Sequence, residues 1–346
     1  MFYLILKVLL ITKIMKYIPY SKKDIKSISN STFLITGGAG FIGSNIVKFL
    51  LENNAKFVKV IDDLSNGVFE NVSKFIDREN FQFIEGDIRD QNLIENSLKG
   101  IDYVSHQAAL GSVPRSIKNP IDSNSVNVDG FLNILNSIKN INKKIKLVYA
   151  SSSSVYGDSN LSPKVEKITG NLLSPYAATK KINEMYADIF FKVWGINSVG
   201  LRYFNVFGPN QQPDNPYAAV IPLFSSALIS GNPPVINGDK NISRDFTYVD
   251  NVVQANIKAM FCKKVKSHKV YNVGCGKSTS LIEIINQINK ILNKKIIPKI
   301  GPYRKGDILH SLASIDSIKD DLGYIPTVPF EQGIMKTINW MLNDYE

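Results

Sequence analysis

The chain has 346 residues, of which 44% are hydrophobic and 21% are charged, and its formal net charge is +11. A chain of this length and composition can bury an apolar core without disulfides or metals, either as one large α/β domain or as a large domain with a smaller partner. Disordered, collagen-like and repeat proteins are excluded, because the sequence contains no internal repeat and no low-complexity tract.

The positive charge does not indicate a nucleic-acid partner. The lysines are scattered singly and in pairs and do not alternate with aromatic residues, so a solvated surface explains them better. Two cysteines, Cys262 and Cys275, are too few for a disulfide framework, which is typical of a protein of the reducing cytoplasm. The histidines His106, His268 and His310 show no metal-ligand spacing, so we expect no metal site.

Residues 1–15 form an apolar stretch that Lys7 and Lys13 interrupt. It is too short to span a bilayer, which takes about 20 apolar residues, and no signal-peptide cleavage site follows it. Three interpretations remain: a helix on a membrane surface, an additional packed helix, or sequence upstream of a native start at Met15. We favour the last two together, and we expect no membrane span.

After Ser31, short apolar runs alternate with amphipathic segments of helix length, which is typical of a parallel sheet covered on both faces. The expected strands are residues 33–36, 57–61, 81–84, 102–105, 146–150 and 198–202, and the expected helices are residues 41–53, 92–98, 126–139 and 176–194. After Asn205, repeated prolines break this rhythm. The sequence therefore predicts an α/β fold with an N-terminal extension (1–31), a Rossmann-type doubly wound parallel sheet (mainly 32–204), and a smaller interwoven substrate domain (mainly 205–346) with segments that return to the sheet.

The first expected strand runs into a glycine-rich turn, residues 37–43 (GGAGFIG), that opens the first helix. Gly37, Gly40 and Gly43 suit this place because backbone amides must approach a pyrophosphate closely and the helix N-terminus is partially positive. Glycine also serves ordinary turns, but a position between a strand and a helix favours dinucleotide binding.

The second expected strand ends at Asp62, where a carboxylate can accept both ribose hydroxyls of an adenosine. Asp63 follows it in place of an arginine and would repel a 2′-phosphate, so NAD is favoured over NADP. Without the glycine turn upstream, a strand-end aspartate that caps a turn would be the better interpretation. Together the two features predict that residues 32–204 mainly bind NAD.

Tyr176 and Lys180 lie four residues apart, on one face of an expected helix. The spacing alone is not specific, because Tyr3 and Lys7 share it. Tyr176 differs from Tyr3 in the motif that we expect near it. The strand at 146–150 is followed by four serines, residues 151–154, at the edge where α/β sheets bind ligands. A polar turn is the alternative interpretation of the serines, but their place favours catalysis.

The chemistry explains why a catalytic tyrosine such as Tyr176 needs a lysine such as Lys180 beside it. A tyrosine with an ordinary pKa of about 10 costs about 4 kcal/mol to use as a base at pH 7. Lys180, together with a positive nicotinamide ring, would favour the phenolate and recover much of this. A serine of the run would hydrogen-bond the same substrate hydroxyl while Tyr176 removes its proton.

These motifs, together with three others, give the chain a clear resemblance to a known family. The other motifs are residues 86–89 (GDIR), 106–109 (HQAA) and 202–205 (RYFN). In this order they resemble the extended short-chain dehydrogenase/reductases that act on nucleotide sugars, from about Thr32 to the C-terminus. Residues 108–116 and 217–222 are similar to the bacterial UDP-N-acetylglucosamine 4-epimerases of polysaccharide biosynthesis (O-antigen included), some of which prefer the uronic acid.

The resemblance implies roles for particular residues. Ser152, Tyr176 and Lys180 would be catalytic. The NAD-binding residues would be Gly37, Gly40, Phe41, Ile42, Gly43, Asp62, Asn66, Gly67, Asp87, Ile88, Gln107, Ala108, Ala109, Tyr176, Lys180 and Phe204. The residues that bind the UDP sugar would be Gly111, Ser112, Ser152, Ser153, Asn205, Gln211, Ala219, Val220, Asn237, Arg244, Arg304, Asp307 and Ser311.

Charge supports two of these assignments. Arginine is rare in this chain, and Arg244 and Arg304 stand where the resemblance requires fixed positive groups for a pyrophosphate. A surface ion pair of Arg244 with Asp245 is the alternative interpretation.

Two departures from the family's motifs reduce the number of reactions and substrates that the resemblance allows. The 4,6-dehydratases carry an Asp-Glu pair, and the decarboxylases a Glu, after the catalytic hydroxyl residue, where this chain has Ser153 and Ser154. Because a serine cannot act as that carboxylate, elimination and decarboxylation are disfavoured, and simple epimerisation is the reaction that remains. Epimerases restricted to glucose and galactose carry a tyrosine at the position of Ser311, and a serine leaves room for a 2-N-acetyl group.

The sequence therefore predicts an NAD-dependent 4-epimerase that interconverts UDP-N-acetylglucosamine and UDP-N-acetylgalactosamine through a 4-keto sugar. The alternatives are a UDP-N-acetylglucosaminuronate 4-epimerase and, more remotely, a non-catalytic NAD-binding regulator. The resemblance also implies a homodimer formed through helices at 126–139 and 176–194, with Phe190, Phe191 and Trp194 on or near the interface. Packing in the core explains these three side chains equally well.

Overall fold

The computed structural model describes residues 20–213, 219–302 and 310–344. The expectations for residues 1–15, Arg304 and Asp307 lie outside these ranges. Within them, no helix is both long enough and apolar enough to cross a membrane.

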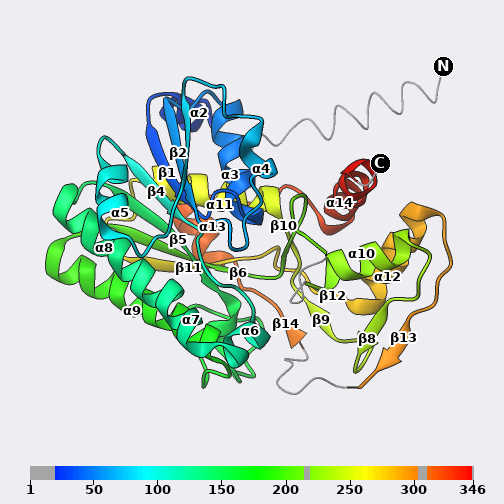
Figure 1. Ribbon diagram of the computed structural model, residues 1–346. Helices are drawn as coiled ribbons and strands as arrows, with labels where there is room; N and C mark the ends of the chain where they lie inside the picture. The colour runs from blue at the N-terminus through cyan, green and yellow to red at the C-terminus, as the bar shows by residue number, and fades with distance from the viewer. Residues whose placement is uncertain (1–19, 214–218, 303–309, 345–346) are drawn as a thin grey trace.

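A seven-stranded parallel sheet forms the centre of the larger part of the molecule (Figure 1). Its spatial order is β11-β6-β5-β4-β1-β2-β3. The strands are β1 (Thr32–Thr36), β2 (Phe57–Asp62), β3 (Phe81–Glu85), β4 (Tyr103–His106), β5 (Lys146–Ser152), β6 (Ser198–Tyr203) and β11 (Lys269–Val273). The doubly wound α/β fold is confirmed, and all six strands expected before Asn205 are present. The seventh strand was missed.

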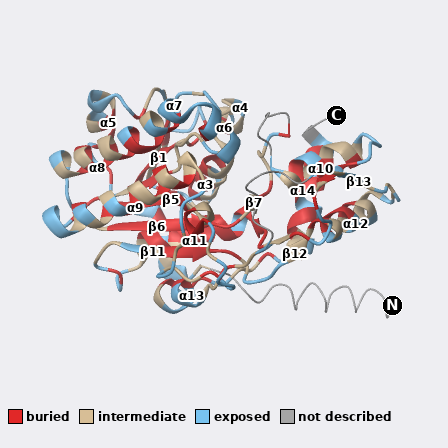
Figure 2. Cartoon of the chain, turned by 90° about the horizontal axis from the view of Figure 1, so that it is seen from below, coloured by how far each residue is buried: buried red, intermediate tan, exposed pale blue. Residues whose placement is uncertain are grey.

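Helices cover both faces of this sheet and bury two separate apolar clusters. One face carries α2 (Lys22–Ser29), α3 (Phe41–Glu52), α4 (Glu70–Ser73), α11 (Val249–Phe261) and α13 (Asp316–Leu322). The other face carries α5 (Gln91–Leu98), α8 (Gly130–Ile141) and α9 (Pro175–Trp194). The inner strands β5 and β6 are almost fully buried (Figure 2), which explains why they read as continuous apolar runs in the sequence.

A third apolar cluster organises the smaller part of the molecule, to the right in Figure 1. Its helices are α10 (Val220–Ile229), α12 (Leu281–Leu292) and α14 (Phe330–Asp344). Short strands accompany them: β7 (Val206–Phe207), β8 (Val235–Asn237), β9 (Ser243–Arg244), β10 (Thr247–Tyr248), β12 (Thr279–Ser280), β13 (Lys299–Gly301) and β14 (His310–Ser311). β9 pairs with both β12 and β14, so three distant segments of the chain meet there.

Local signals fix the ends of the helix that carries Tyr176. The Ser174 side chain accepts a hydrogen bond from the Ala177 N–H, and Pro175 occupies the first helical position. Gly195 ends the helix with φ +76°, a left-handed conformation that favours glycine. α9 is therefore held at both ends, and its buried face is presented to the carboxyl end of β5.

The segment before α8 departs from the expected helix at 126–139. It folds into α6 (Val113–Lys118), α7 (Pro120–Asn124) and a π-helical turn (Ser125–Asp129) that leads directly into α8. Such a turn inserts an extra residue into the helix and is frequent at functional sites.

Candidate active site

Two glycines of the glycine-rich turn, Gly37 and Gly43, are packed too closely for a side chain. Gly37 has φ +68°, and a Cβ there would lie 2.5 Å from the Ala108 nitrogen. A Cβ on Gly43 would lie 2.1 Å from the Gly37 carbonyl oxygen. Gly40 is the N-cap of α3 and provides no side-chain cap, so the first N–H groups of the helix remain available to an anion. This cradle fits the pyrophosphate of a dinucleotide.

Asp62 lies at the end of β2 and lines a cavity together with Gly37 and Gly40 of this cradle. Its carboxylate accepts hydrogen bonds from the N–H groups of Ala39 (2.9 Å) and Leu64 (3.0 Å), so it also caps the turn. Burial raises the pKa of Asp62, and these hydrogen bonds oppose that rise. The cavity beside it is lined by several of the residues predicted to bind NAD: Asn66, Gly67, Ile88, Gln107, Ala108 and Ala109.

NAD binding by Asp87 and Phe204 stays a prediction, because neither is among the residues that line this cavity, although Gly86 and Ile88 on either side of Asp87 do line it. The Asp87 carboxylate accepts hydrogen bonds from the Arg89 guanidinium, which holds its pKa below the usual range, and Asp87 is not among the residues that line this cavity. The Phe204 side chain is fully buried against Val155, Tyr156 and Ala313. Its neighbour Tyr203, by contrast, lines the cavity of about 450 Å³ that Tyr176 and Lys180 also line.

One cavity of about 450 Å³ brings the glycine turn and the predicted catalytic residues together. Its lining includes the glycines, Phe41 and Ile42 on one side, and Ser152, Tyr176 and Lys180 on the other. Gly111, Ser112 and Gln211, predicted to contact the sugar, line it as well. Ser153 is not among the lining residues, because it begins a 3₁₀ turn (Ser153–Tyr156) that leads away from β5.

Lys180 is buried directly beneath this cavity. Its Nζ donates a hydrogen bond to the Ala150 carbonyl at 2.9 Å and lies 6.0 Å from the centroid of the Tyr176 ring. Burial lowers the pKa of Lys180 to about 8. Burial raises the pKa of the Tyr176 phenol, and a hydrogen bond with Ser152 lowers it in part. The arrangement supplies a phenol, a hydroxyl and a cation at one point.

A buried ion pair supports the same helix face. Glu184 lies four residues after Lys180, and its carboxylate accepts two hydrogen bonds from the Arg202 guanidinium, each at 2.8 Å. The side chains of Glu184 and Arg202 are only 5% and 3% exposed. The Ser151 hydroxyl also donates to Glu184, at 2.7 Å. Sequence reasoning missed Glu184, although the four-residue spacing of Tyr176 and Lys180 extends to it.

Asn127, in the π-helical turn, is a second residue that sequence reasoning missed. Its side-chain oxygen accepts from the Leu110 N–H at 2.7 Å, and its amide donates to the Leu110 carbonyl at 3.1 Å. The same amide donates to the Thr179 hydroxyl at 3.2 Å. A buried asparagine therefore ties the loop that lines the cavity to α9. The signal was a polar residue between Val126 and Val128 in a segment that was expected to be helical.

A second cavity of about 260 Å³ adjoins the first through Asn205, Val206 and Ala219, which line both. Five of the residues that were predicted to bind the substrate line it: Asn205, Ala219, Val220, Asn237 and Arg244. Ser311 pairs with Arg244 across β14 and β9. Asp245 is fully buried rather than on the surface, so the alternative of a surface ion pair with Arg244 is wrong.

The histidines have structural surroundings. His106 is buried with its Nδ1 2.8 Å from the Thr36 hydroxyl, and burial lowers its pKa to about 3, so the ring is neutral. His268 contacts the Ser198 hydroxyl, and burial lowers its pKa to about 4. Within residues 20–213, 219–302 and 310–344, no group of three or more His, Cys, Asp or Glu residues could hold a metal ion.

Comparison with known proteins identifies the family. The model of the NAD dependent epimerase/dehydratase family matches residues 33–274. The chain belongs to this family. NAD is the family's cofactor, and the glycine cradle and Asp62 described above fit it.

Relatives of this epimerase/dehydratase-family chain cover nearly its whole length. It is 36% identical over 313 residues to a putative UDP-glucose 4-epimerase of Methanocaldococcus jannaschii, covering 90% of this chain and 98% of that one. Among solved structures, it is similar to the UDP-N-acetylglucosamine 4-epimerase of Methanobrevibacter ruminantium in complex with UDP-N-acetylmuramic acid. That structure has a TM-score of 0.85 and 40% identity, and the match covers 91% of this chain and 99% of that one. The UDP-glucuronic acid 4-epimerase of Bacillus cereus, with UDP-glucuronic acid and NAD, has a TM-score of 0.84 and 30% identity, with 91% and 100% covered.

Proposed function

We propose that this chain is an enzyme of the UDP-sugar 4-epimerase class that interconverts UDP-N-acetylglucosamine and UDP-N-acetylgalactosamine for surface polysaccharide biosynthesis. The observation that carries the proposal is the continuity of the site. The central cavity joins the NAD cradle to Ser152, Tyr176 and Lys180, and then opens into the cavity of Arg244. Relatives that cover the same length of chain are described as epimerases of UDP sugars, which supports the class.

Each catalytic side chain has a task in this reaction. Tyr176 removes the proton of the sugar 4-hydroxyl, while Ser152 hydrogen-bonds the same oxygen. Lys180 favours the phenolate of Tyr176 through its positive charge. NAD, which the glycine turn and Asp62 would hold, would supply the hydride chemistry at C4. The 4-keto sugar must turn within the cavity of about 450 Å³, which Ser152, Tyr176 and Lys180 line, so that its other face is presented.

The surroundings of Ser152 favour epimerisation over elimination. The next two residues are serines, and neither can act as the carboxylic acid that an elimination needs. The buried Glu184 carboxylate, which the Ser151 hydroxyl contacts, is also occupied by the Arg202 guanidinium. No proton donor for the carbon next to C4 is therefore available from these residues.

The preference for an N-acetylated sugar depends on Ser311. In the Ser311→Tyr variant, we expect kcat/KM for UDP-N-acetylglucosamine to fall at least about tenfold, with kcat/KM for UDP-glucose retained, because a phenol ring fills the space of the acetyl group. Ser311→Ala serves as the control and should retain both activities. Equal losses on the two substrates, or no loss, would contradict the assignment.

One observation favours the uronic acid as a second candidate substrate. Arg115 lines the central cavity together with Ser152 and Tyr176, and a guanidinium is suited to a carboxylate. UDP-N-acetylglucosaminuronate therefore belongs in the same substrate panel. A higher kcat/KM for the uronate than for UDP-N-acetylglucosamine would select this candidate.

The proposal divides the chain between the two ligands. Residues 32–204 mainly bind NAD, residues 205–346 mainly bind the UDP sugar, and β11 returns from the second set to the sheet. A regulator without catalytic activity is disfavoured, because Tyr176 and Lys180 are both present and line the same cavity.

We also propose a homodimer formed through α9. The side chains of Met185, Ile189 and Val193 follow one another at four-residue spacing and are 56%, 47% and 61% exposed, which makes an apolar stripe. Phe190, predicted near this interface, instead packs in the core. Trp194 packs against Phe190 with the rings tilted by 51° and 4.5 Å between their centroids. Sedimentation velocity at micromolar concentration should show a dimer, and a monomer would refute it.

A further inference from the structure

Asp245 is a fully buried carboxylate that takes no part in the chemistry described above. It follows Arg244 at the end of β9 and is 0% exposed. Its Oδ1 accepts a hydrogen bond from the Cys275 N–H at 2.8 Å. Its Oδ2 accepts from the Gly276 N–H at 2.9 Å and from the Ala313 N–H at 3.3 Å. One side chain thus holds the backbones of two segments, after β11 and after β14.

The backbone of Asp245 makes two further connections. Its N–H donates to the Ser311 carbonyl at 2.8 Å, and its carbonyl accepts from the Asn205 side chain at 3.2 Å. Asn205 has φ +32°, an unusual backbone conformation that this bond helps to hold. Three residues of the proposed substrate site, Asn205, Arg244 and Ser311, are therefore each adjacent to or hydrogen-bonded with Asp245.

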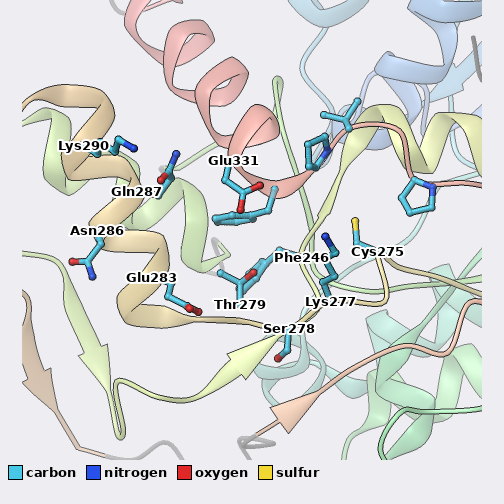
Figure 3. Close-up of a pocket in the computed structure, with 14 residues that line it drawn as sticks. Phe246, Cys275, Lys277, Ser278, Thr279, Glu283, Asn286, Gln287, Lys290 and Glu331 are labelled. Atoms are coloured by element: carbon cyan, nitrogen blue, oxygen red, sulfur yellow. The ribbon is translucent and has the colours of Figure 1, made fainter. Parts of the chain in front are cut away.

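The space around the carboxylate is closely filled. A Cβ on Gly274 would lie 2.7 Å from the Asp245 Oδ2. Phe246, the next residue, separates the substrate cavity from a further cavity of about 520 Å³ on its other side. Figure 3 shows this cavity of about 520 Å³, where the segment with Cys275 and Lys277 runs beside Phe246.

Burial raises the pKa of Asp245 to about 6, and the three N–H donors oppose this rise. The group is therefore ionised at pH 7 and above, although its burial makes ionisation unfavourable. A carboxylate with only backbone donors around it suits a role in holding loops. Within the part of the chain that the structure describes, the Asp245 carboxylate forms no hydrogen bond or ion pair with Tyr176 or Lys180.

We propose that Asp245 is a positioning residue for nucleotide-sugar binding, which fixes Arg244, Asn205 and Ser311 relative to one another through its bonds to the two segments. The proposal rests on the proposed function, because it assigns the cavity of Arg244 to the UDP part of the substrate. It concerns affinity and not the chemical step, since Asp245 lies beside the substrate cavity and not beside Ser152.

The Asp245→Asn variant tests this inference. An amide keeps one acceptor oxygen and turns an NH₂ group toward an N–H donor, so at least one of the three bonds is lost. We expect KM for UDP-N-acetylglucosamine and the calorimetric Kd for UDP to rise about 10- to 100-fold, with kcat within about threefold of wild type. Asp239→Asn is the matched control: Asp239 is exposed and accepts from the Asn241 N–H at 2.8 Å in the same part of the molecule. It should leave both constants unchanged.

A second variant keeps the test decisive if Asp245→Asn does not fold. Gly274→Ala retains the carboxylate but displaces it, because the added methyl group would lie 2.7 Å from Oδ2. It should raise the Kd for UDP in the same direction. An unchanged UDP affinity in the folded variants, or a fall in kcat as large as the rise in KM, would overturn the inference.

The UDP titration also separates the two proposals. A wild-type protein that binds UDP without epimerising any UDP sugar would refute the proposed function, while the variants would still test Asp245. A variant that binds UDP as the wild type does would refute the role of Asp245 and leave the epimerase unaffected.

Discussion

Replacing Tyr176 by phenylalanine should lower kcat by about 10³-fold, within the range that a positioned general base contributes. Only the phenolic oxygen is lost, and Lys180 keeps its hydrogen bond to the Ala150 carbonyl. The affinity for UDP should stay within about twofold of wild type, because Arg244 and the other residues of the second cavity are untouched. Turnover is followed by proton NMR and UDP affinity by calorimetry.

Tyr186→Phe is the matched control for this variant. Tyr186 lies on the same helix and packs against the apolar cluster between the sheet and helices α5, α8 and α9. Its loss of a hydroxyl should change kcat by less than about twofold. A Tyr176→Phe variant with wild-type turnover would remove the proposed base from the mechanism.

The second large effect is expected at the ion pair beneath the catalytic helix. Glu184→Gln removes a charge that Arg202 holds through two hydrogen bonds in the interior, and leaves a buried guanidinium without its counter-ion. Breaking such a pair costs about 3–5 kcal/mol of unfolding free energy. We also expect kcat to fall, because the Ser151 hydroxyl donates to the same carboxylate, one residue before Ser152.

Urea unfolding measures this loss, and the chain offers a control one turn further along α9. Asp188→Asn breaks the pair of Asp188 with Lys192, whose side chains are 42% and 66% exposed, so we expect less than about 1 kcal/mol. Equal stabilities of Glu184→Gln and the wild type would contradict a structural role for the buried pair.

The same pair predicts how stability depends on pH. Burial opposes the ionisation of Glu184, but the hydrogen bonds and charge of Arg202 outweigh it and lower its pKa. A lowered carboxylate pKa gives stability that is present above the ordinary glutamate pKa of about 4.3 and is lost as the pH falls through the folded-state value. Wild type and Glu184→Gln should therefore converge in stability at low pH.

The sequence predicted the sheet well because its strands are buried on both faces and read as apolar runs. β1 through β6 match the expected runs to within two residues at each end. β11 was missed because it follows the expected sheet residues by more than sixty positions. The π-helical turn before α8 was also missed, since its residues continue a helical pattern and its conformation depends on contacts that Asn127 makes with Leu110.

The site was predictable where residues lie close together in sequence. The glycine turn and the pair Tyr176 and Lys180 needed only local spacing, and one cavity contains both. Asp245 could not be interpreted in this way. Its neighbour Arg244 suggested an ion pair, whereas its carboxylate binds the backbones of Cys275 and Ala313, 30 and 68 residues away.

The most direct test of the central claim is turnover by the purified protein with no added cofactor. UDP-N-acetylglucosamine is incubated with the enzyme, and the anomeric proton signals are followed by NMR. We expect conversion to UDP-N-acetylgalactosamine up to an equilibrium mixture, with no release of a keto sugar, because an epimerisation causes no net oxidation or reduction of the sugar. No conversion of this substrate, even after NAD is supplied, would contradict it.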